Sequence, residues 1–385
     1  MQNWLLPEYI QDMLPDEAWC VEQMRVQFLD LSSRFGYQLV SPPLLEYVES
    51  LLIDGSDDMD LRSFKLVDQL SGRTLALRAD ITPQVARIDA HLLNRQGVER
   101  LCYAGSVLHT QPIGLTRTRE LMQIGAELYG YAGLEGDWEI QQLMLQSLNL
   151  MGVKEVHLDL GHVGVFRALV NRAKLDADIE STLFAALQNK DSSALQVLVR
   201  PLDETLAKAL LVLPTLYGDC ADVLQQARRK LPEYTEITAA LDDLQGISTR
   251  LKRLVPSVGI DLADLRGYHY HSGMVFAAYH AGCHDAVALG GRYDNLGKCF
   301  GRARPATGFS MDLRQLYRLL PLQQRKSGIS APQLDDASLL EMINKLRDEG
   351  ETVVVDFLGD AKLRKELQCD RELVLREGVW QVVAL

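Results

Sequence analysis

The sequence has few cysteines and no long apolar run. Its six cysteines are scattered over 385 residues, and none stands in a C-x-x-C pair. Disulfide frameworks are typical of short secreted chains, so we expect free thiols and a cytoplasmic location. No segment approaches the roughly 18 consecutive apolar residues of a membrane-spanning helix, and the start lacks a basic segment followed by an apolar one. We therefore expect no membrane association.

Positive charge is also in short supply. Lys and Arg number 40 against 52 Asp and Glu, which gives a formal net charge of −12. Nucleic-acid binding depends on clustered Lys and Arg side chains that displace counterions from phosphates. We therefore expect no nucleic-acid partner. The length allows roughly two to three ordinary globular domains.

Recognisable phosphate and metal motifs are scarce as well. The stretch "ALGGRYDNLGKCFGR" lacks both the P-loop pattern and the dinucleotide fingerprint, and a close-packed turn is the simpler interpretation. His269 and His271 share one face of an expected strand, with His280, Cys283 and His284 a little later. Zinc ligands are usually paired at short spacing on turns or on one helix, so we expect no metal. An organic ligand among aromatic and imidazole groups fits better.

Hydrophobic periodicity divides the chain into three parts. The first part predicts helices at 16–35, 83–94 and 139–151, short strands turning at Ser71-Gly72, and a polar loop at 53–60. From about 165 to 255 the pattern is rich in Leu and Ala and predicts a helical insertion. Strand-like sequence returns in "LRGYHYHSGMVFAAYH" and "AVALGGRYDNL".

The expected fold class is α+β. Strands joined by hairpins, with few βαβ units, predict an antiparallel sheet flanked by helices. We expect this sheet and the helical insertion in a domain at 1–325, and a small α/β module at 326–385.

The stretch "AGSVLHTQPIGLTRTRELMQIGAELYG", residues 104–130, predicts two strands joined by a loop. Alternation in the second strand separates two faces. Gln123, Gly125 and Glu127 share the polar face, and the other face is formed by Met122, Ile124, Ala126 and Leu128. The polar face is either a solvated side of the sheet or the floor of a pocket in which Gly125 lets a ligand lie close. The pattern alone leaves both interpretations open.

Several stretches, taken in order, resemble the class II aminoacyl-tRNA synthetases. "GYQLVSPPLLEY" is similar to motif 1, with Gly36, Pro43 and Glu46 at the matching positions; the hairpin is similar to motif 2, and "GFSMDLRQL" to motif 3. "LRADITPQVAR", "LRGYHYHSGMVF" and "GGRYDNL" resemble signatures of histidyl-tRNA synthetase in particular. The resemblance extends from the N-terminus to about Leu320, and it implies that family's fold with its helical insertion.

The resemblance also implies a histidine pocket. By motif position, Asp80, Thr82 and Gln123 would hold the α-ammonium group, and Glu127 would pair with the imidazole. The remaining residues of this pocket would be Arg266, Tyr270, His271 and Tyr293. Asp80 stands where the family has glutamate, and His271 where it has tyrosine.

The resemblance fails at the ATP-binding positions. His109 and Gln111 occupy a motif that reads F-R-x-E in the family, Gln315 replaces the motif 3 arginine, and Asp312 replaces a glycine. Arginine gives phosphate a permanent charge and paired donors, which histidine and glutamine do not. Each lost donor costs about 3 kcal/mol of transition-state stabilisation. We therefore expect no catalytic residue, no cofactor and no amino-acid activation, although Arg117 and Arg119 remain candidate phosphate contacts.

This chain keeps the histidine-binding positions of the synthetases and loses their ATP-binding positions, and in this combination it resembles a second family. This is the family of regulatory subunits of short-form ATP phosphoribosyltransferase, the first enzyme of histidine biosynthesis. The resemblance implies a non-catalytic chain that activates a small catalytic subunit and mediates feedback inhibition by L-histidine. It also implies a dimer through motif 1 within a hetero-oligomer, expected to be a hetero-octamer.

Two alternatives stay open at this point. One is a divergent but working histidyl-tRNA synthetase, and the other is a histidine-binding synthetase paralogue with a different partner. The C-terminal module is shorter than the anticodon-binding domain of the synthetases, and the acidic net charge also argues against tRNA binding. Both features favour the regulatory role.

Overall fold

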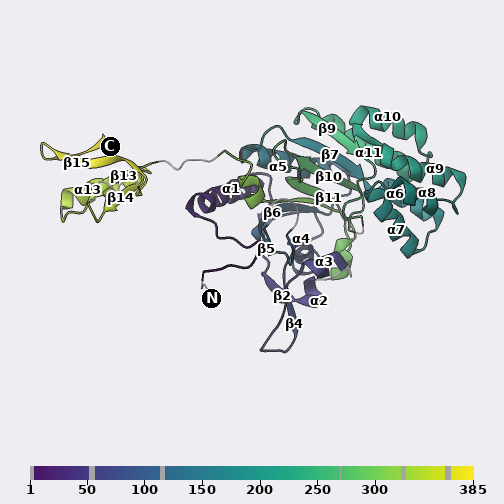
Figure 1. Cartoon of the computed structure of the whole chain (residues 1–385), viewed down its shortest axis with the longest axis horizontal. Coiled ribbons are helices and arrows are strands. Elements are labelled where there is room, and N and C mark those ends of the chain that lie inside the picture. Colours follow the sequence, from purple (N-terminus) through teal and green to yellow (C-terminus); the bar gives the residue numbers. More distant parts are fainter. Residues whose placement is uncertain (1–3, 52–56, 113–117, 269, 322–326, 360–365) are drawn as a thin grey trace. The chain divides into compact units, whose positions relative to one another are not determined.

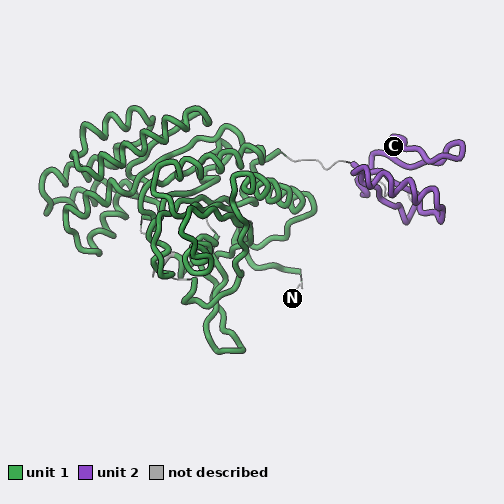
Figure 2. The backbone as a smooth tube through the Cα atoms, turned by 180° about the vertical axis from the view of Figure 1, so that it is seen from behind, with its two compact units in different colours: residues 1–321 green, residues 322–385 purple. Residues whose placement is uncertain are grey.

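The computed structural model describes residues 4–51, 57–112, 118–268, 270–321, 327–359 and 366–385. Two of the candidate site residues, Arg117 and His269, lie outside these ranges. The chain divides into two units, Met1–Pro321 and Leu322–Leu385 (Figure 2). Within the described ranges, no helix is both long enough and apolar enough to cross a membrane.

A large sheet forms the centre of the first unit. Nine strands of the described chain contribute to it, in the order β1-β5-β6-β12-β11-β10-β7-β9-β8 (Figure 1). Every neighbouring pair from β5 to β7 is antiparallel, whereas β1 is parallel to β5, and β9 to β7. The bounds are β1 Gln38–Leu39, β5 Glu99–Leu108, β6 Glu120–Tyr129, β7 His157–His162, β8 Tyr217–Asp219, β9 Ser257–Asp261, β10 Met274–Tyr279, β11 Ala288–Arg292 and β12 Ala306–Asp312. The expected α+β fold class is confirmed, with parallel pairs added near both ends of the sheet.

The hairpin of β5 and β6 divides its side chains as the alternation predicts. Ile124, Ala126 and Leu128 enter the hydrophobic core. The long helices α1 (Pro15–Arg34) and α5 (Leu134–Leu150) contribute to the same core. The opposite face of β6 is not solvated at its far end, because only 1% of Glu127 is exposed.

Three short strands form a second sheet in the order β2-β4-β3. They are β2 Leu45–Tyr47, β3 Lys65–Val67 and β4 Thr74–Leu77. Gly72 has a φ of +71° at the turn between β3 and β4, a conformation that glycine adopts without strain. The short helices of this region are α2 Val48–Leu51, α3 Asp57–Arg62, α4 Thr82–Arg87 and the π-helical turn Ile88–Leu93 that continues α4.

Helix α3 corrects the polar loop expected at 53–60. Its sequence, "DDMDLR", is acidic at the start and basic at the end, which complements the helix dipole. Its end is held to the hairpin, since the backbone N–H of Thr110 donates to the carbonyl of Arg62 at 2.9 Å. Charge placement and this contact favour a helix where polarity alone suggested a loop.

The insertion is helical apart from the short strand β8, which joins the main sheet. It comprises α6 Val163–Ala173, α7 Ala177–Gln188, α8 Ser192–Leu198, α9 Glu204–Val212, a 3₁₀ turn Leu213–Thr215, α10 Cys220–Lys230 and α11 Thr235–Leu251. Asp191, Asp203 and Asp219 each accept hydrogen bonds from first-turn backbone N–H groups, which fixes the starts of α8, α9 and α10. The group lies at the end of the sheet that carries β7 and β9 (Figure 1).

The segment before β10 is not a strand, contrary to the sequence-based expectation. Described residues between Arg266 and Tyr270 form turns, and β10 begins only at Met274. Gly267 has a φ of +62°, which interrupts an extended backbone. The guanidinium of Arg167 donates to the carbonyls of Tyr268 and His271, at 3.2 and 2.9 Å, and so satisfies acceptors that a strand would have paired. We call this the turn segment, residues 264–268 and 270–273.

The second unit is a small α/β module. Its sheet has the order β14-β13-β15-β16, with β13 parallel to both of its neighbours. The bounds are β13 Gly328–Pro332, α13 Ala337–Asp348, β14 Val353–Asp356, β15 Cys369–Arg376 and β16 Val379–Ala384. Ile329, Leu339, Ile343, Leu373 and Trp380 form part of a separate hydrophobic core. Asp336 caps α13 by accepting from the backbone N–H groups of Ser338 and Leu339.

Candidate ligand-binding site

Two adjoining cavities lie along the polar face of the main sheet. The larger has a volume of 670 Å³ and contains Glu127; we call it the Glu127 pocket. The smaller has a volume of 440 Å³ and contains His109; we call it the His109 pocket. Residues shared by both linings are Met59, Arg62, Asp80, Arg266, Leu289 and Ser310. Gly308 on β12 is needed here, because a Cβ at this position would overlap the carboxylate of Glu127.

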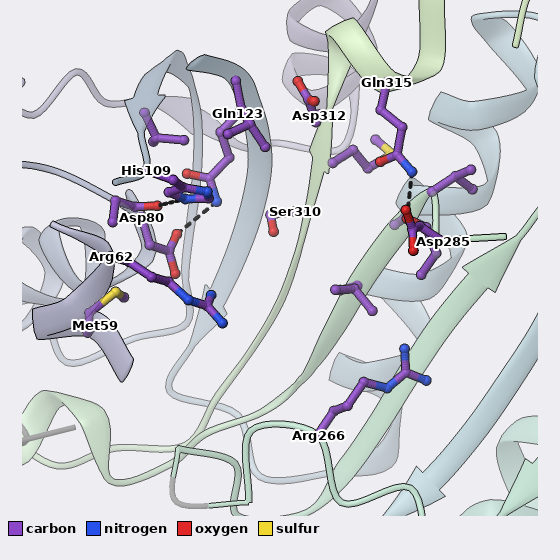
Figure 3. Close-up of a pocket in the computed structure, with 18 residues that line it drawn as sticks. Met59, Arg62, Asp80, His109, Gln123, Arg266, Asp285, Ser310, Asp312 and Gln315 are labelled. Atoms are coloured by element: carbon purple, nitrogen blue, oxygen red, sulfur yellow. Dashed lines mark hydrogen bonds between the residues drawn. The ribbon is translucent and has the colours of Figure 1, made fainter. Parts of the chain in front are cut away.

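Asp80 organises one wall. Its Oδ1 accepts hydrogen bonds from Nε2 of Gln123 at 2.7 Å, and from the backbone N–H and hydroxyl of Thr82 at 3.1 and 3.2 Å. Oε1 of Gln123 accepts in turn from the backbone N–H of Ile81 at 3.0 Å. Figure 3 shows the hydrogen bond between Gln123 and Asp80, with Arg62 pointing into the same cavity. The three residues predicted to hold an ammonium group therefore lie together.

Glu127 is buried at the floor of its pocket. Its Oε1 accepts from the hydroxyl of Tyr103 at 3.2 Å, and its Oε2 accepts from the hydroxyl of Tyr293. Burial and, less strongly, the nearby Asp80 carboxylate together raise the pKa of Glu127 to about 8, against the opposing effect of the hydroxyl donors. Two carboxyl groups, those of Asp80 and Glu127, face one cavity, so a ligand that brings hydrogen-bond donors or positive charge would favour the ionised form of Glu127.

Aromatic rings form a second wall. Tyr270 packs on Tyr293 with ring centroids 4.9 Å apart and an interplanar angle of 35°. The Tyr270 hydroxyl is buried, and no partner for it exists within the described part of the chain. An unsatisfied buried hydroxyl costs about 1–3 kcal/mol. A ligand that hydrogen-bonds to this hydroxyl would remove the cost.

His271 and Arg266 extend this wall from the turn segment. Nδ1 of His271 lies 3.2 Å from the carbonyl oxygen of Arg266, and burial lowers the pKa of His271 to about 4, so its ring is neutral at pH 7. The Arg266 guanidinium pairs with Asp264, with Nε 2.8 Å from Oδ1. Seven of the eight predicted histidine-binding residues line the Glu127 pocket, and Gln123 lines the His109 pocket. Their role in binding histidine stays a prediction.

The positions that bind ATP in the synthetases have different contacts here. Nε2 of His109 lies 2.8 Å from the carbonyl oxygen of Ala79, and only 6% of His109 is exposed. Nε2 of Gln315 donates to the carbonyl of Ala286 at 3.1 Å (Figure 3). Both side chains therefore contact backbone carbonyls, and neither supplies the permanent guanidinium charge of an arginine.

Asp312 has a capping role in addition to its place in the His109 pocket. Its Oδ1 accepts from the backbone N–H of Arg314 at 3.1 Å, which caps the short helix α12 (Leu313–Tyr317), and from that of Met122 at 3.1 Å. Burial raises the pKa of Asp312 to about 6. The carboxylate still adds negative charge to a cavity that would have to receive a triphosphate.

Two of the residues predicted from the ATP-site motifs lie outside both the His109 pocket and the Glu127 pocket. Gln111 is exposed and lines neither cavity. Arg119 also lines neither: its guanidinium carbon lies 4.7 Å from the centroid of the Phe64 ring, and its Nε donates to the carbonyl of His109 at 3.1 Å. A phosphate contact by Arg119 therefore has no support from this geometry.

Comparison with known protein families agrees with this arrangement. Residues 9–316 match a family model described as histidyl-tRNA synthetase. Residues 326–383 match one described as the ATP phosphoribosyltransferase subunit HisZ C-terminal domain. The chain is 56% identical over 387 residues to an ATP phosphoribosyltransferase regulatory subunit of Nitrosospira multiformis, covering 99% of this chain and 98% of that one. This chain belongs to the family of ATP phosphoribosyltransferase regulatory subunits.

Further relatives agree with this assignment. A regulatory subunit of Burkholderia cenocepacia is 56% identical over 382 residues, covering 99% of each chain. A crystal structure from Bacillus halodurans, described as an ATP phosphoribosyltransferase regulatory subunit/histidyl-tRNA synthetase, has a TM-score of 0.83 and 27% identity, covering 95% of this chain and 96% of that one. A histidyl-tRNA synthetase from Nostoc has a TM-score of 0.79 over 100% of this chain and 97% of that one; at 19% identity it supports the fold alone. The family expected from the motifs is confirmed.

Sequence reasoning missed several lining residues of this regulatory-subunit chain, four of them on helices. Met59 and Arg62 come from α3; Met59 lies in the stretch interpreted as a loop, and Arg62 was assigned to no element. Phe184 and Gln188 come from α7 of the insertion. A signal for Met59 and Arg62 was present in "DDMDLR", because acidic residues at the start and a basic residue at the end are typical of a helix. Nothing in the sequence connected α7 with motifs that lie some eighty residues further along.

Proposed function

We propose that this chain is the non-catalytic regulatory subunit of an ATP phosphoribosyltransferase and that it binds L-histidine in the Glu127 pocket. The observation that carries the proposal is the buried carboxyl of Glu127, held by two tyrosine hydroxyls in one cavity with Asp80. The adjoining cavity has His109 and Gln315 at positions where the synthetases have arginine. The pocket thus favours an amino acid with donor groups and disfavours ATP.

Histidine suits the two carboxylates of this cavity. Its α-ammonium group would bind Asp80, oriented by Thr82 and Gln123, and its imidazole N–H would donate to Glu127. Tyr270 would hydrogen-bond to the ring, and Arg266 would attract the α-carboxylate. A charged hydrogen-bond pair in a buried site contributes about 1.5–3 kcal/mol, so these contacts would supply both affinity and selectivity.

Loss of ATP chemistry is the other half of the proposal. Adenylate formation needs fixed positive charge around the reacting phosphate. The His109 pocket offers Arg62 and Arg266 only where it joins the Glu127 pocket, and it adds the carboxyls of Asp285 and Asp312. A triphosphate would therefore meet a cavity whose charges do not favour it, and we infer no catalysis by this chain alone.

Regulation requires a catalytic partner. As a regulatory subunit, the chain would join a catalytic subunit of ATP phosphoribosyltransferase, activate it, and make it sensitive to histidine. Histidine must then bind the inhibited assembly more tightly, typically by about 1–3 kcal/mol of coupling free energy. We further propose a dimer of this chain within a hetero-octamer, with domains at 1–325 and 326–385. A cytoplasmic location without nucleic-acid or membrane partners remains our expectation.

Reconstitution tests this proposal. Purified catalytic subunit is assayed alone and with this chain, and the mixture is passed over a sizing column. We expect one larger complex and faster turnover, with inhibition by histidine only in the complex. Unchanged elution volume, turnover and histidine response would refute the regulatory role. Glu22→Gln, on the exposed face of α1, provides a surface control for variants of the pocket.

A further inference from the structure

Helix α7 of the insertion reaches the Glu127 pocket. Phe184 and Gln188 line the same cavity as Glu127, Tyr270 and His271. Because they are four residues apart on one helix, their side chains lie on the same face. One wall of the pocket therefore comes from the insertion, whereas the floor comes from the main sheet.

An aromatic cluster holds α7 to the turn segment. The ring of Phe184 stacks on that of Tyr268, with centroids 5.4 Å apart and an interplanar angle of 29°. Phe166 of α6 packs edge-on against the same tyrosine, at 5.1 Å and 69°. The Tyr268 hydroxyl donates to Oε1 of Glu180 at 2.6 Å, one helical turn before Phe184. Tyr268 is thus held by two helices of the insertion and is 4% exposed.

A guanidinium adds a second connection. Arg167 of α6 donates to the carbonyls of Tyr268 and His271 and lies over the Tyr268 ring, 5.2 Å from its centroid. Side chains of the insertion therefore help to hold the turn segment, which presents Arg266, Tyr270 and His271 to the cavity. A shift of α7 would move pocket residues as well as the wall itself.

We propose that α7 is a ligand-responsive wall of the histidine site, with Phe184 and Gln188 facing the ligand, and that bound histidine strengthens the contact between α7 and the turn segment. This inference rests on the proposed function of the Glu127 pocket. If the docked form of α7 binds histidine better, histidine favours the docked form by the same factor. Occupancy of the pocket is thereby transmitted to the outer surface of the insertion.

Hydrogen exchange and calorimetry test this coupling on the full chain. With saturating histidine, we expect the backbone amides of α7 to exchange about fivefold more slowly than without it, within the usual range of allosteric coupling. Phe184→Ala removes the stacked ring and should weaken histidine binding about tenfold and abolish the added protection. Ile179→Ala, on the same helix and 40% exposed, is the matched control and should behave like the wild type.

Tyr268→Phe separates the two contacts of the cluster. It keeps the stack with Phe184 and removes the hydroxyl that donates to Glu180, so we expect a smaller loss of affinity than for Phe184→Ala. Should Phe184→Ala fail to fold, the exposed Gln188→Ala gives the same test through a ligand-facing side chain. Circular dichroism checks folding in each case.

The outcomes distinguish this inference from the function on which it rests. If the wild type does not bind histidine, the proposed function fails. If the wild type binds histidine and Glu127→Gln weakens binding, the proposed function stands. Unchanged affinity in Phe184→Ala and Gln188→Ala, with no added protection of α7 in the wild type, would then overturn the role of α7 alone.

Discussion

The hydroxyl of Tyr293 donates a hydrogen bond to Glu127, and both side chains are almost fully buried. Tyr103 donates to the other carboxylate oxygen at 3.2 Å. The two hydroxyls come from different parts of the chain, so the carboxyl is fixed on both sides. Glu127 can then receive a ligand without moving, and a preorganised group loses less entropy on binding.

Replacing Glu127 tests the ligand assignment. Glu127→Gln keeps the shape and one acceptor, but it cannot ionise, as Glu127 would when an imidazole N–H binds to it. We expect histidine affinity to fall by about ten- to a hundredfold, equivalent to one charge-assisted hydrogen bond. Titration calorimetry measures this, with Glu22→Gln as control. Equal affinity in wild type and Glu127→Gln would contradict the assignment.

The raised pKa of Glu127 predicts a pH dependence of stability. In the folded chain this pKa is about 8, above the ordinary value of 4.5, so the folded state holds the proton over a range where the unfolded state releases it. The contribution of Glu127 is therefore fully present below pH 4.5 and is lost as pH rises through about 8. Glu127→Gln should lack this loss.

Denaturant unfolding from pH 5 to 9 checks this expectation. The difference in unfolding free energy between Glu127→Gln and wild type should move in favour of the variant as pH rises. If the difference in unfolding free energy stayed constant from pH 5 to 9, the raised pKa of Glu127 would be contradicted. Added histidine should reduce the pH effect in the wild type, because a bound donor stabilises the carboxylate.

Removal of the Tyr293 hydroxyl should destabilise the unliganded chain. Tyr293→Phe leaves one buried carboxylate oxygen without its donor, which costs about 1–3 kcal/mol. Urea unfolding measures the loss. Tyr217→Phe is a suitable control because Tyr217 is 60% exposed. If the two variants unfold at the same urea concentration, the Tyr293 contact does not contribute as we describe.

Amino-acid activation should be absent. Histidine-dependent exchange between ATP and pyrophosphate should stay at background for the wild type, because His109 and Gln315 lack the permanent charge and paired donors of arginine. His109→Arg alone should not restore exchange, since Gln315, Asp285 and Asp312 still line the same cavity. Clear exchange by the wild type would instead favour a working synthetase.

The sequence predicted the pocket residues that lie on strands more reliably than those that lie on helices and turns. Gln123 and Glu127 were found by alternation, because a strand with a period of two fixes which residues share a face. The turn segment was misassigned as a strand, since alternation of Tyr and His imitates one while Gly267 and the contacts of Arg167 prevent it. Phe184 reaches the pocket through packing between distant segments, which local pattern does not report. Arg62 follows directly after the stretch whose polarity resembled a loop, and no pattern assigned it to a helix.

Histidine inhibition of the reconstituted complex tests the central claim most directly. The turnover of a catalytic ATP phosphoribosyltransferase subunit is titrated with histidine in the presence of wild type, Glu127→Gln or Glu22→Gln. We expect all three to activate equally, and the inhibition midpoint of Glu127→Gln alone to rise about ten- to a hundredfold, as its loss of affinity requires. An identical midpoint for all three would show that histidine does not act through the Glu127 pocket.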